Sequence, residues 1–129
     1  MKIKGIIEED FVNYKKPSMY IAFPKCSFKC GRADCQNSAL AKEKDIEVSA
    51  NYIIQTYLDN PIPNAIVCCG LEPFDSWEDL KDLIIKMRQY NDDDIIIYTG
   101  YIEEEIKDKV KWLSKYKNII VKFGRFVPN

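Results

Sequence analysis

The chain has 129 residues, a length typical of one domain, and 47% of them are hydrophobic, which is enough to form a substantial core. Its 19 basic and 20 acidic residues give a formal net charge of −1 at pH 7, so the overall charge favours neither nucleic acid nor an anionic membrane as a partner. The absence of histidine excludes Ser-His-Asp and Cys-His nucleophiles and histidine-ligated zinc. From the length and the hydrophobic content we expect a single domain over residues 1–129.

Cysteine usage indicates the compartment. The chain contains five cysteines, an odd number, and its first residues lack the apolar run of an export signal. No uninterrupted apolar stretch approaches the ~20 residues needed to cross a bilayer. We expect the protein to be cytoplasmic, where clustered cysteines bind metal or do redox work more often than they form disulfides.

The first half of the chain predicts two strands and a helix. Residues 2–7 and the more apolar residues 18–23 are predicted strands, and a loop that contains three cysteines follows the second. Ser49 is a candidate cap for a helix whose apolar residues recur at helical spacing. Asn60-Pro61 is expected to end that helix.

The second half continues the alternation of strands and helices. Residues 65–69 form a short apolar run typical of a buried parallel strand, and Ser76 with Asp79 fits a capping box at the start of the next helix. A strand over 94–99, a helix over 102–116 and a strand over 118–123 complete the pattern.

Strands that alternate with helices in this way must be joined by crossover connections, which make a sheet mostly parallel. A closed eight-stranded barrel needs ~250 residues, about twice what this chain supplies. The predicted fold is therefore an α/β single domain with an open half-barrel or partial TIM-like (β/α) sheet.

Unusual segments follow four of the predicted strands. These are the cysteine loop 25–35, the turn 70–73, the turn 99–101 and the segment 124–126. Because the carboxyl ends of parallel strands share one edge, the four segments are predicted to meet there and to form the ligand site.

The strongest chemical signal is the triad of Cys26, Cys30 and Cys35. Three thiolates on one loop suit a 4Fe–4S cluster, and three ligands on four irons leave one iron open to a substrate. The alternative is a zinc site completed by Asp34, Cys68 or Cys69. Closed zinc sites usually contain two close cysteine pairs, which fits this triad less well. Cys68 and Cys69 lie in an apolar run and are expected to belong, one or both, to the core.

Segments spread over residues 19–126 have counterparts, in the same order, in one group of enzymes. They are the strand and cysteine loop 19–30, Cys35-Gln36-Asn37, Gly70-Leu71-Glu72-Pro73, Tyr98-Thr99-Gly100-Tyr101 and Gly124-Arg125-Phe126. On these segments the chain resembles the radical S-adenosylmethionine (SAM) enzymes, particularly the small activating proteins of anaerobic ribonucleotide reductase. The chain differs from the family pattern in the longer spacing between Cys30 and Cys35, in Asp34 at the often aromatic position before the last cysteine, and in Leu71 at the second glycine of the turn.

The resemblance implies the cofactors and the residues that bind them. Cys26, Cys30 and Cys35 would be the ligands of a 4Fe–4S cluster whose open iron chelates SAM. Gly70, Leu71 and Glu72 would contribute mainly backbone groups to the methionine end of SAM, and Thr99 and Gly100 would border its pocket. Phe28 and Tyr101 would cover the cluster or adenine, or be ordinary hydrophobic residues of the rim. No catalytic residue beyond the cluster ligands is expected.

The resemblance also implies the reaction. Reductive cleavage of SAM would give a 5′-deoxyadenosyl radical that generates a glycyl radical on a partner enzyme, with anaerobic ribonucleotide reductase favoured, and flavodoxin or ferredoxin would supply the electron. Two alternatives stay open. One is a radical SAM enzyme that acts on a small molecule or peptide, and the other is a noncatalytic Fe–S or zinc-binding module.

Overall fold

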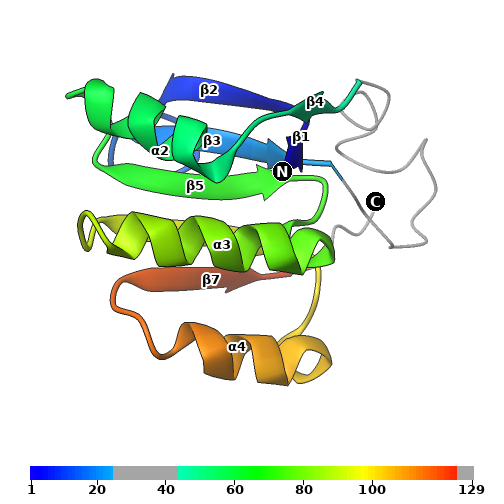
Figure 1. The fold of residues 1–129 in the computed structure, drawn as a ribbon. Helices are drawn as coiled ribbons and strands as arrows, with labels where there is room; N and C mark the ends of the chain where they lie inside the picture. Colours follow the sequence, from blue (N-terminus) through cyan, green and yellow to red (C-terminus); the bar gives the residue numbers. More distant parts are fainter. Residues whose placement is uncertain (25–43, 125–129) are drawn as a thin grey trace.

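The computed structural model describes residues 1–24 and 44–124 (Figure 1). The three cysteines of the predicted triad, Asp34 and the segment Arg125-Phe126 lie outside the described residues. The elements in chain order are β1 (Lys2–Ile3), β2 (Gly5–Asp10), β3 (Ser18–Phe23), β4 (Ile46–Glu47), α2 (Ala50–Asp59), β5 (Ala65–Gly70), the 3₁₀ turn η1 (Pro73–Ser76), α3 (Trp77–Arg88), β6 (Asp94–Thr99), the 3₁₀ turn η2 (Glu103–Ile106), α4 (Lys107–Leu113) and β7 (Ile119–Phe123).

The central feature is a five-stranded sheet in the order β2-β3-β5-β6-β7. Strands β3, β5, β6 and β7 are parallel, and β2 pairs antiparallel with β3 at one edge. The outer strands β2 and β7 do not pair with each other, so the sheet does not close into a barrel. The predicted fold class, an open and mostly parallel α/β sheet, is confirmed.

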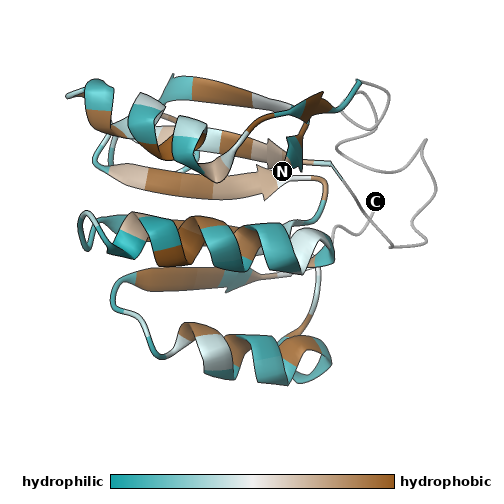
Figure 2. Cartoon of the chain, viewed as in Figure 1, coloured by the Kyte–Doolittle hydropathy of each residue, from teal (hydrophilic) through white to brown (hydrophobic). Residues whose placement is uncertain are grey.

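Within the described ranges, the main core lies between the sheet and the three helices α2, α3 and α4, which all lie on one face of the sheet (Figure 1). Strands β5 and β7 are hydrophobic along most of their length, whereas α3 and α4 alternate hydrophobic with hydrophilic residues (Figure 2). The predicted apolar stripe of α3 is confirmed, because Leu80, Leu83, Ile84 and Met87 are fully buried. None of the helices described is long and apolar enough to span a membrane.

The opposite face of the sheet carries a smaller apolar cluster of Ala65, Val67 and Ile96. The connection between β2 and β3 covers its amino-terminal part, since the Tyr14 hydroxyl donates to Asp94 Oδ2 at 2.7 Å. Tyr20, Cys69 and Tyr98 pack at the border of this cluster and remain half-buried. No helix among the described residues covers them, so part of this face is open.

The first predicted strand, over residues 2–7, is wrong as a single element. Lys2–Ile3 forms β1, which pairs with β4 in a separate two-stranded sheet, and a new strand, β2, runs from Gly5 to Asp10. The break falls at Lys4, whose backbone N–H donates to the Ala22 carbonyl at 2.7 Å and whose ammonium pairs with Asp45 at 2.8 Å. The acidic end of β2 is compatible with a strand because β2 lies at an exposed edge.

The start of α3 also differs from the prediction. Ser76 is buried at the end of η1 and makes no capping hydrogen bond with its side chain, so the predicted capping box is not formed. The predicted helix over 102–116 likewise begins with the 3₁₀ turn η2, and α4 covers only Lys107–Leu113. Ser49, by contrast, caps α2 as predicted by accepting the Tyr52 N–H at 3.0 Å.

Gly70 fixes how closely β5 approaches β3. Its φ is +85°, and an added Cβ would lie 2.4 Å from the backbone nitrogen of Phe23 and 2.6 Å from the Cα of Ala22. Both atoms belong to the backbone of β3, which is paired with a strand on each side, so neither can move aside cheaply. Glycine is therefore required here by sterics and by backbone conformation together.

We predict that Gly70→Ala lowers the free energy of unfolding by at least about 2 kcal/mol, because it adds backbone strain and a steric clash. Gly5→Ala is the matched control, since a Cβ at Gly5 meets nothing within 4 Å. Urea denaturation of both variants measures the difference. Equal stabilities would show that the close approach at Gly70 is not a constraint.

Candidate functional site

The carboxyl ends of three neighbouring strands define the candidate site. Phe23 ends β3 opposite Gly70, the last residue of β5, and β6 lies beside β5 and ends at Thr99. The end of β3, which precedes the cysteine loop in the sequence, therefore lies directly beside the turn that begins at Gly70. As predicted, the turns after β5 and β6 lie together at one edge of the sheet.

The carboxylate of Glu72 connects these two turns. Its side chain is fully buried, and Oε1 accepts the Gly100 backbone N–H at 2.8 Å. Its Oε2 accepts the Thr99 hydroxyl at 2.8 Å and the Phe74 backbone N–H at 3.1 Å. Three of the predicted site residues, Glu72, Thr99 and Gly100, are thus brought into direct contact.

Burial and the three hydrogen bonds shift the pKa of the Glu72 carboxyl in opposite directions. Burial raises the pKa of its carboxyl above the ordinary value, and the donors at Gly100, Thr99 and Phe74 oppose that rise because they stabilise the charged form. All three donors point at the carboxylate oxygens, so the side chain has a structural role inside the turn. The Glu72 carboxylate is therefore used within the fold, and the role of the turn's backbone toward SAM stays a prediction.

The backbone conformation of the turn accommodates leucine at position 71. Its N–H donates to the Phe23 carbonyl at 3.0 Å, which ties the turn to the end of β3. Among the described residues, the positive φ angles belong to Gly70, Asn118 and Gly124, so Leu71 does not need the conformational freedom of glycine. Its amide is therefore used within the fold.

A second link between the turns, which was not predicted from the sequence, runs through Tyr101 and Asp75. The Tyr101 N–H donates to Thr99 Oγ1 at 3.1 Å, and the Tyr101 hydroxyl donates to Asp75 Oδ1. Tyr101 is half-buried against the main core. Its ring and hydroxyl are therefore used to hold η1 against the turn after β6. The clue in the sequence was Pro73, which favours a helical first turn directly after Glu72.

Cys68 and Cys69 point to opposite faces of the sheet. Cys68 is fully buried in the main core, where burial raises the pKa of its thiol and so disfavours the thiolate that metal binding requires. Its prediction as a core residue is confirmed. Cys69 is half-buried beside Tyr20 on the open face. Within residues 1–24 and 44–124, no three His, Cys, Asp or Glu side chains are grouped so that they could hold a metal ion.

We predict that Glu72→Gln lowers the free energy of unfolding by about 1–3 kcal/mol, because the amide NH₂ must face at least one of the N–H or O–H donors that the carboxylate accepts. Glu104→Gln makes the same chemical change at an exposed position and should have little effect. Denaturation curves of the two variants test this, and equal losses would mean that the buried carboxylate does not organise the turns.

The raised pKa of Glu72 predicts a pH dependence of stability. The folded chain binds this proton more tightly than the unfolded chain, in which glutamate has a pKa of about 4.3. As pH rises from about 4.3 through the folded-state pKa, the wild-type chain should therefore lose stability relative to Glu72→Gln, and the difference should be constant above that window. A difference that grows in favour of wild type over the same window would show that the folded-state pKa is lowered instead.

Comparison with known proteins gives one family. A family model described as a 4Fe-4S single cluster domain matches residues 18–129, most of the chain and all of the candidate site. No curated protein matches the chain. No solved structure matches it either. The matched range includes the cysteine loop and both turns held by Glu72, and on this match the chain belongs to the family of 4Fe-4S single cluster domains.

Proposed function

We propose that this chain holds a 4Fe–4S cluster through Cys26, Cys30 and Cys35 and cleaves SAM reductively to generate a glycyl radical on a partner enzyme. The favoured partner is anaerobic ribonucleotide reductase, and the electron donor is a protein such as flavodoxin or ferredoxin. The family assignment supports the cluster. The use of SAM rests on the resemblance of the two turns and of the cysteine loop to radical SAM enzymes.

The observation that carries the proposal is the pairing of Phe23 with Gly70. It brings the end of β3, after which the cysteine loop follows in the sequence, beside the turn that resembles a methionine-binding turn. A cluster on that loop would then lie next to the backbone of residues 70–72. The donor set also fits: three thiolates in a chain without histidine suit an iron–sulfur cluster with one open iron.

The residues of the site would act by holding the turn in place. With its carboxylate bonded to Thr99, Gly100 and Phe74, Glu72 cannot rotate out towards a ligand without breaking three hydrogen bonds. The backbone of Gly70 and Leu71 is fixed by the sheet on its other side. This preorganisation would orient the amino and carboxylate groups of SAM without a charged side chain from this turn.

When bound, the cluster would supply one electron that breaks the bond between the SAM sulfur and its 5′ carbon, giving methionine and a 5′-deoxyadenosyl radical. That radical would take a hydrogen atom from a glycine Cα of the partner, leaving 5′-deoxyadenosine and a glycyl radical. No general acid or base is needed for these steps, which is consistent with the absence of histidine.

The open face of the sheet favours a protein substrate. Tyr20, Cys69 and Tyr98 lie half-buried there, and no described helix covers them. A radical reaction next to such a face requires that solvent be excluded. A large partner that docks on it would close the site, whereas a small substrate would leave it open.

The first experiment measures SAM cleavage by the anaerobically reconstituted, reduced protein. We expect a bound iron–sulfur cluster and 5′-deoxyadenosine from the wild-type chain, and loss of both by at least about tenfold in Cys26→Ser, Cys30→Ser and Cys35→Ser. Cys69→Ser is the matched control and should retain both. Colourless protein that contains zinc and yields no 5′-deoxyadenosine would contradict the proposal.

The partner is tested by adding anaerobic ribonucleotide reductase to the same reaction. The proposal predicts a glycyl-radical doublet in the electron paramagnetic resonance spectrum that depends on SAM and on this chain. An intact cluster that cleaves SAM without forming the doublet would favour a small molecule or a peptide as the substrate.

A further inference from the structure

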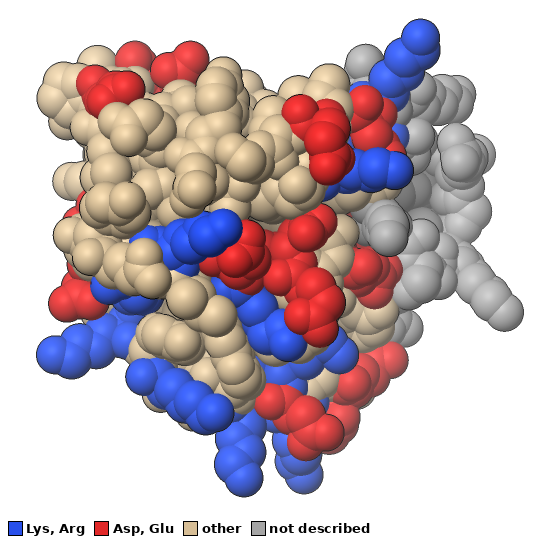
Figure 3. Space-filling view, in the orientation of Figure 1, with Lys and Arg blue, Asp and Glu red and all other residues tan. Residues whose placement is uncertain are grey.

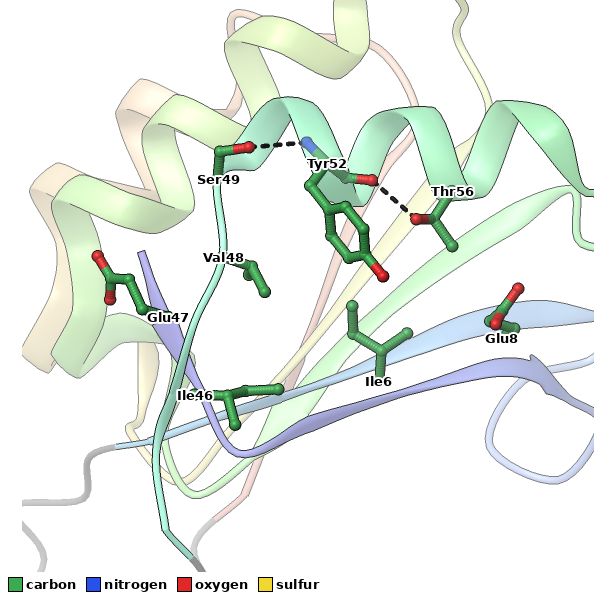
Figure 4. Close-up of a pocket in the computed structure, with 8 residues that line it drawn as sticks. All are labelled: Ile6, Glu8, Ile46, Glu47, Val48, Ser49, Tyr52 and Thr56. Atoms are coloured by element: carbon green, nitrogen blue, oxygen red, sulfur yellow. Dashed lines mark hydrogen bonds between the residues drawn. The ribbon is translucent and has the colours of Figure 1, made fainter.

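A groove of about 530 Å³ lies between the edge strand β2 and the start of α2 (Figure 4). Ile6 and Tyr52 point toward each other across it, and Val48 and Ile46 extend the apolar surface along its length (Figure 4). Glu8 lies at one end of the groove and Glu47 at the other (Figure 4). The groove therefore has an apolar centre and acidic ends, and the hydroxyls of Ser49 and Thr56 on its α2 wall are bonded to the helix backbone.

Two of the apolar side chains in the groove are strongly exposed. Ile46 is 46% exposed and Tyr52 57% exposed, although both belong to ordered elements. The surface over α2 carries few charged side chains (Figure 3), and Asp59 is the only charged residue of that helix. Exposed apolar side chains around a concave surface are typical of a binding site.

Strand β2 forms one wall of the groove and has an unpaired edge. In the described part of the chain β2 pairs only with β3, so alternate backbone N–H and C=O groups on its outer side have no strand to bond. An edge strand beside a helix, with an apolar groove between them, matches the geometry in which proteins bind an extended peptide as an additional strand.

Charge limits which segment can pair there. Glu8 and Glu9 of β2 are exposed, and the nearby Lys4 is already paired with Asp45 and is only 7% exposed. In an antiparallel pair of two β2 strands the acidic end of each strand would face residues 5–7 of the other, which include no basic residue, so a second copy gives no charge attraction there. A segment that carries Lys or Arg would be attracted instead.

We propose that this groove binds an extended segment of another protein as an additional strand on β2. The segment places an aliphatic side chain among Ile6, Ile46 and Tyr52 and a Lys or Arg beside Glu8. Main-chain hydrogen bonds to β2 give the affinity, and the aliphatic and basic positions give the specificity.

A segment bound in the groove would reach the edge of the sheet that carries the candidate cofactor site. Gly5 of β2 pairs with Ala22 of β3, so the amino-terminal end of β2 lies at the same edge of the sheet as the candidate cofactor site. A segment bound along β2 ends at that edge and holds its protein there. The inference does not depend on the chemistry of the cluster, because it rests only on β2, β4 and α2.

The test uses a seven-residue peptide of alternating lysine and isoleucine, labelled with fluorescein, and the full-length protein. We expect saturable binding by fluorescence anisotropy, with amide chemical-shift changes confined to β2, β4 and the first turns of α2. Glu8→Lys should weaken binding about five- to tenfold at low salt, because it replaces an attraction with a repulsion. Tyr52→Ala should also weaken it, and Glu104→Lys, which makes the same charge change elsewhere, should not.

Exchanging the charges of the peptide and of residue 8 tests whether the attraction between them is specific. A peptide of alternating glutamate and isoleucine should bind Glu8→Lys more tightly than it binds the wild-type chain. The proposal is overturned if the shifts map elsewhere, or if Glu104→Lys weakens binding as much as Glu8→Lys does. It is also overturned if a lysine-only peptide binds equally well, or if light scattering shows a dimer that Glu8→Lys disrupts.

Discussion

The candidate site depends on one buried carboxylate. Glu72 occupies the point where the turns after β5 and β6 meet, and its carboxylate accepts two backbone N–H groups and one hydroxyl from the two turns. It also starts η1 and so sets the direction in which α3 leaves the sheet. The shape of this edge therefore follows from an interaction between two turns that are distant in sequence.

The turns after β5 and β6 lead into their helices in the same way. Each turn leads into a short 3₁₀ segment, η1 or η2, before the α-helix begins. In both cases a glutamate accepts backbone N–H groups at the start: Glu72 accepts the Phe74 N–H, and Glu105 accepts the Ile102 N–H. These contacts fix how each helix starts beside the edge where the cofactors are proposed to bind. The helices therefore help to position the turns of the candidate site as well as to form the core.

Much of this fold could be predicted from the sequence. Apolar runs such as residues 65–69 and 94–99 identify buried parallel strands because both of their faces must be covered. The helix boundaries were less predictable, since Ser76 has the residue type of a cap but is buried by tertiary packing. The split of residues 2–7 depends on Lys4 bonding to the distant Ala22, which no local pattern reveals.

The candidate site was predictable in part. Its glycine and glutamate were identified by resemblance, but the reason for each is tertiary: Gly70 avoids the backbone of β3, and Glu72 bonds across to Thr99 and Gly100. Asp75 and the hydroxyl of Tyr101 were missed because their pairing joins residues 26 positions apart in sequence. The predicted ligands Cys26, Cys30 and Cys35 lie outside the described residues, so their role stays a prediction that rests on the residues and on the family.

The proposed function requires that the three thiolates leave one iron of the cluster open to SAM at this edge of the sheet. Electron–nuclear double resonance on the reduced cluster tests it most directly, with SAM labelled by ¹⁷O in the methionine carboxylate and by ¹⁵N in its amino group. The account predicts hyperfine coupling of both labels to the cluster, and loss of that coupling when unlabelled SAM displaces the labelled molecule. An intact cluster that shows no coupling to either label in the presence of saturating SAM would contradict it.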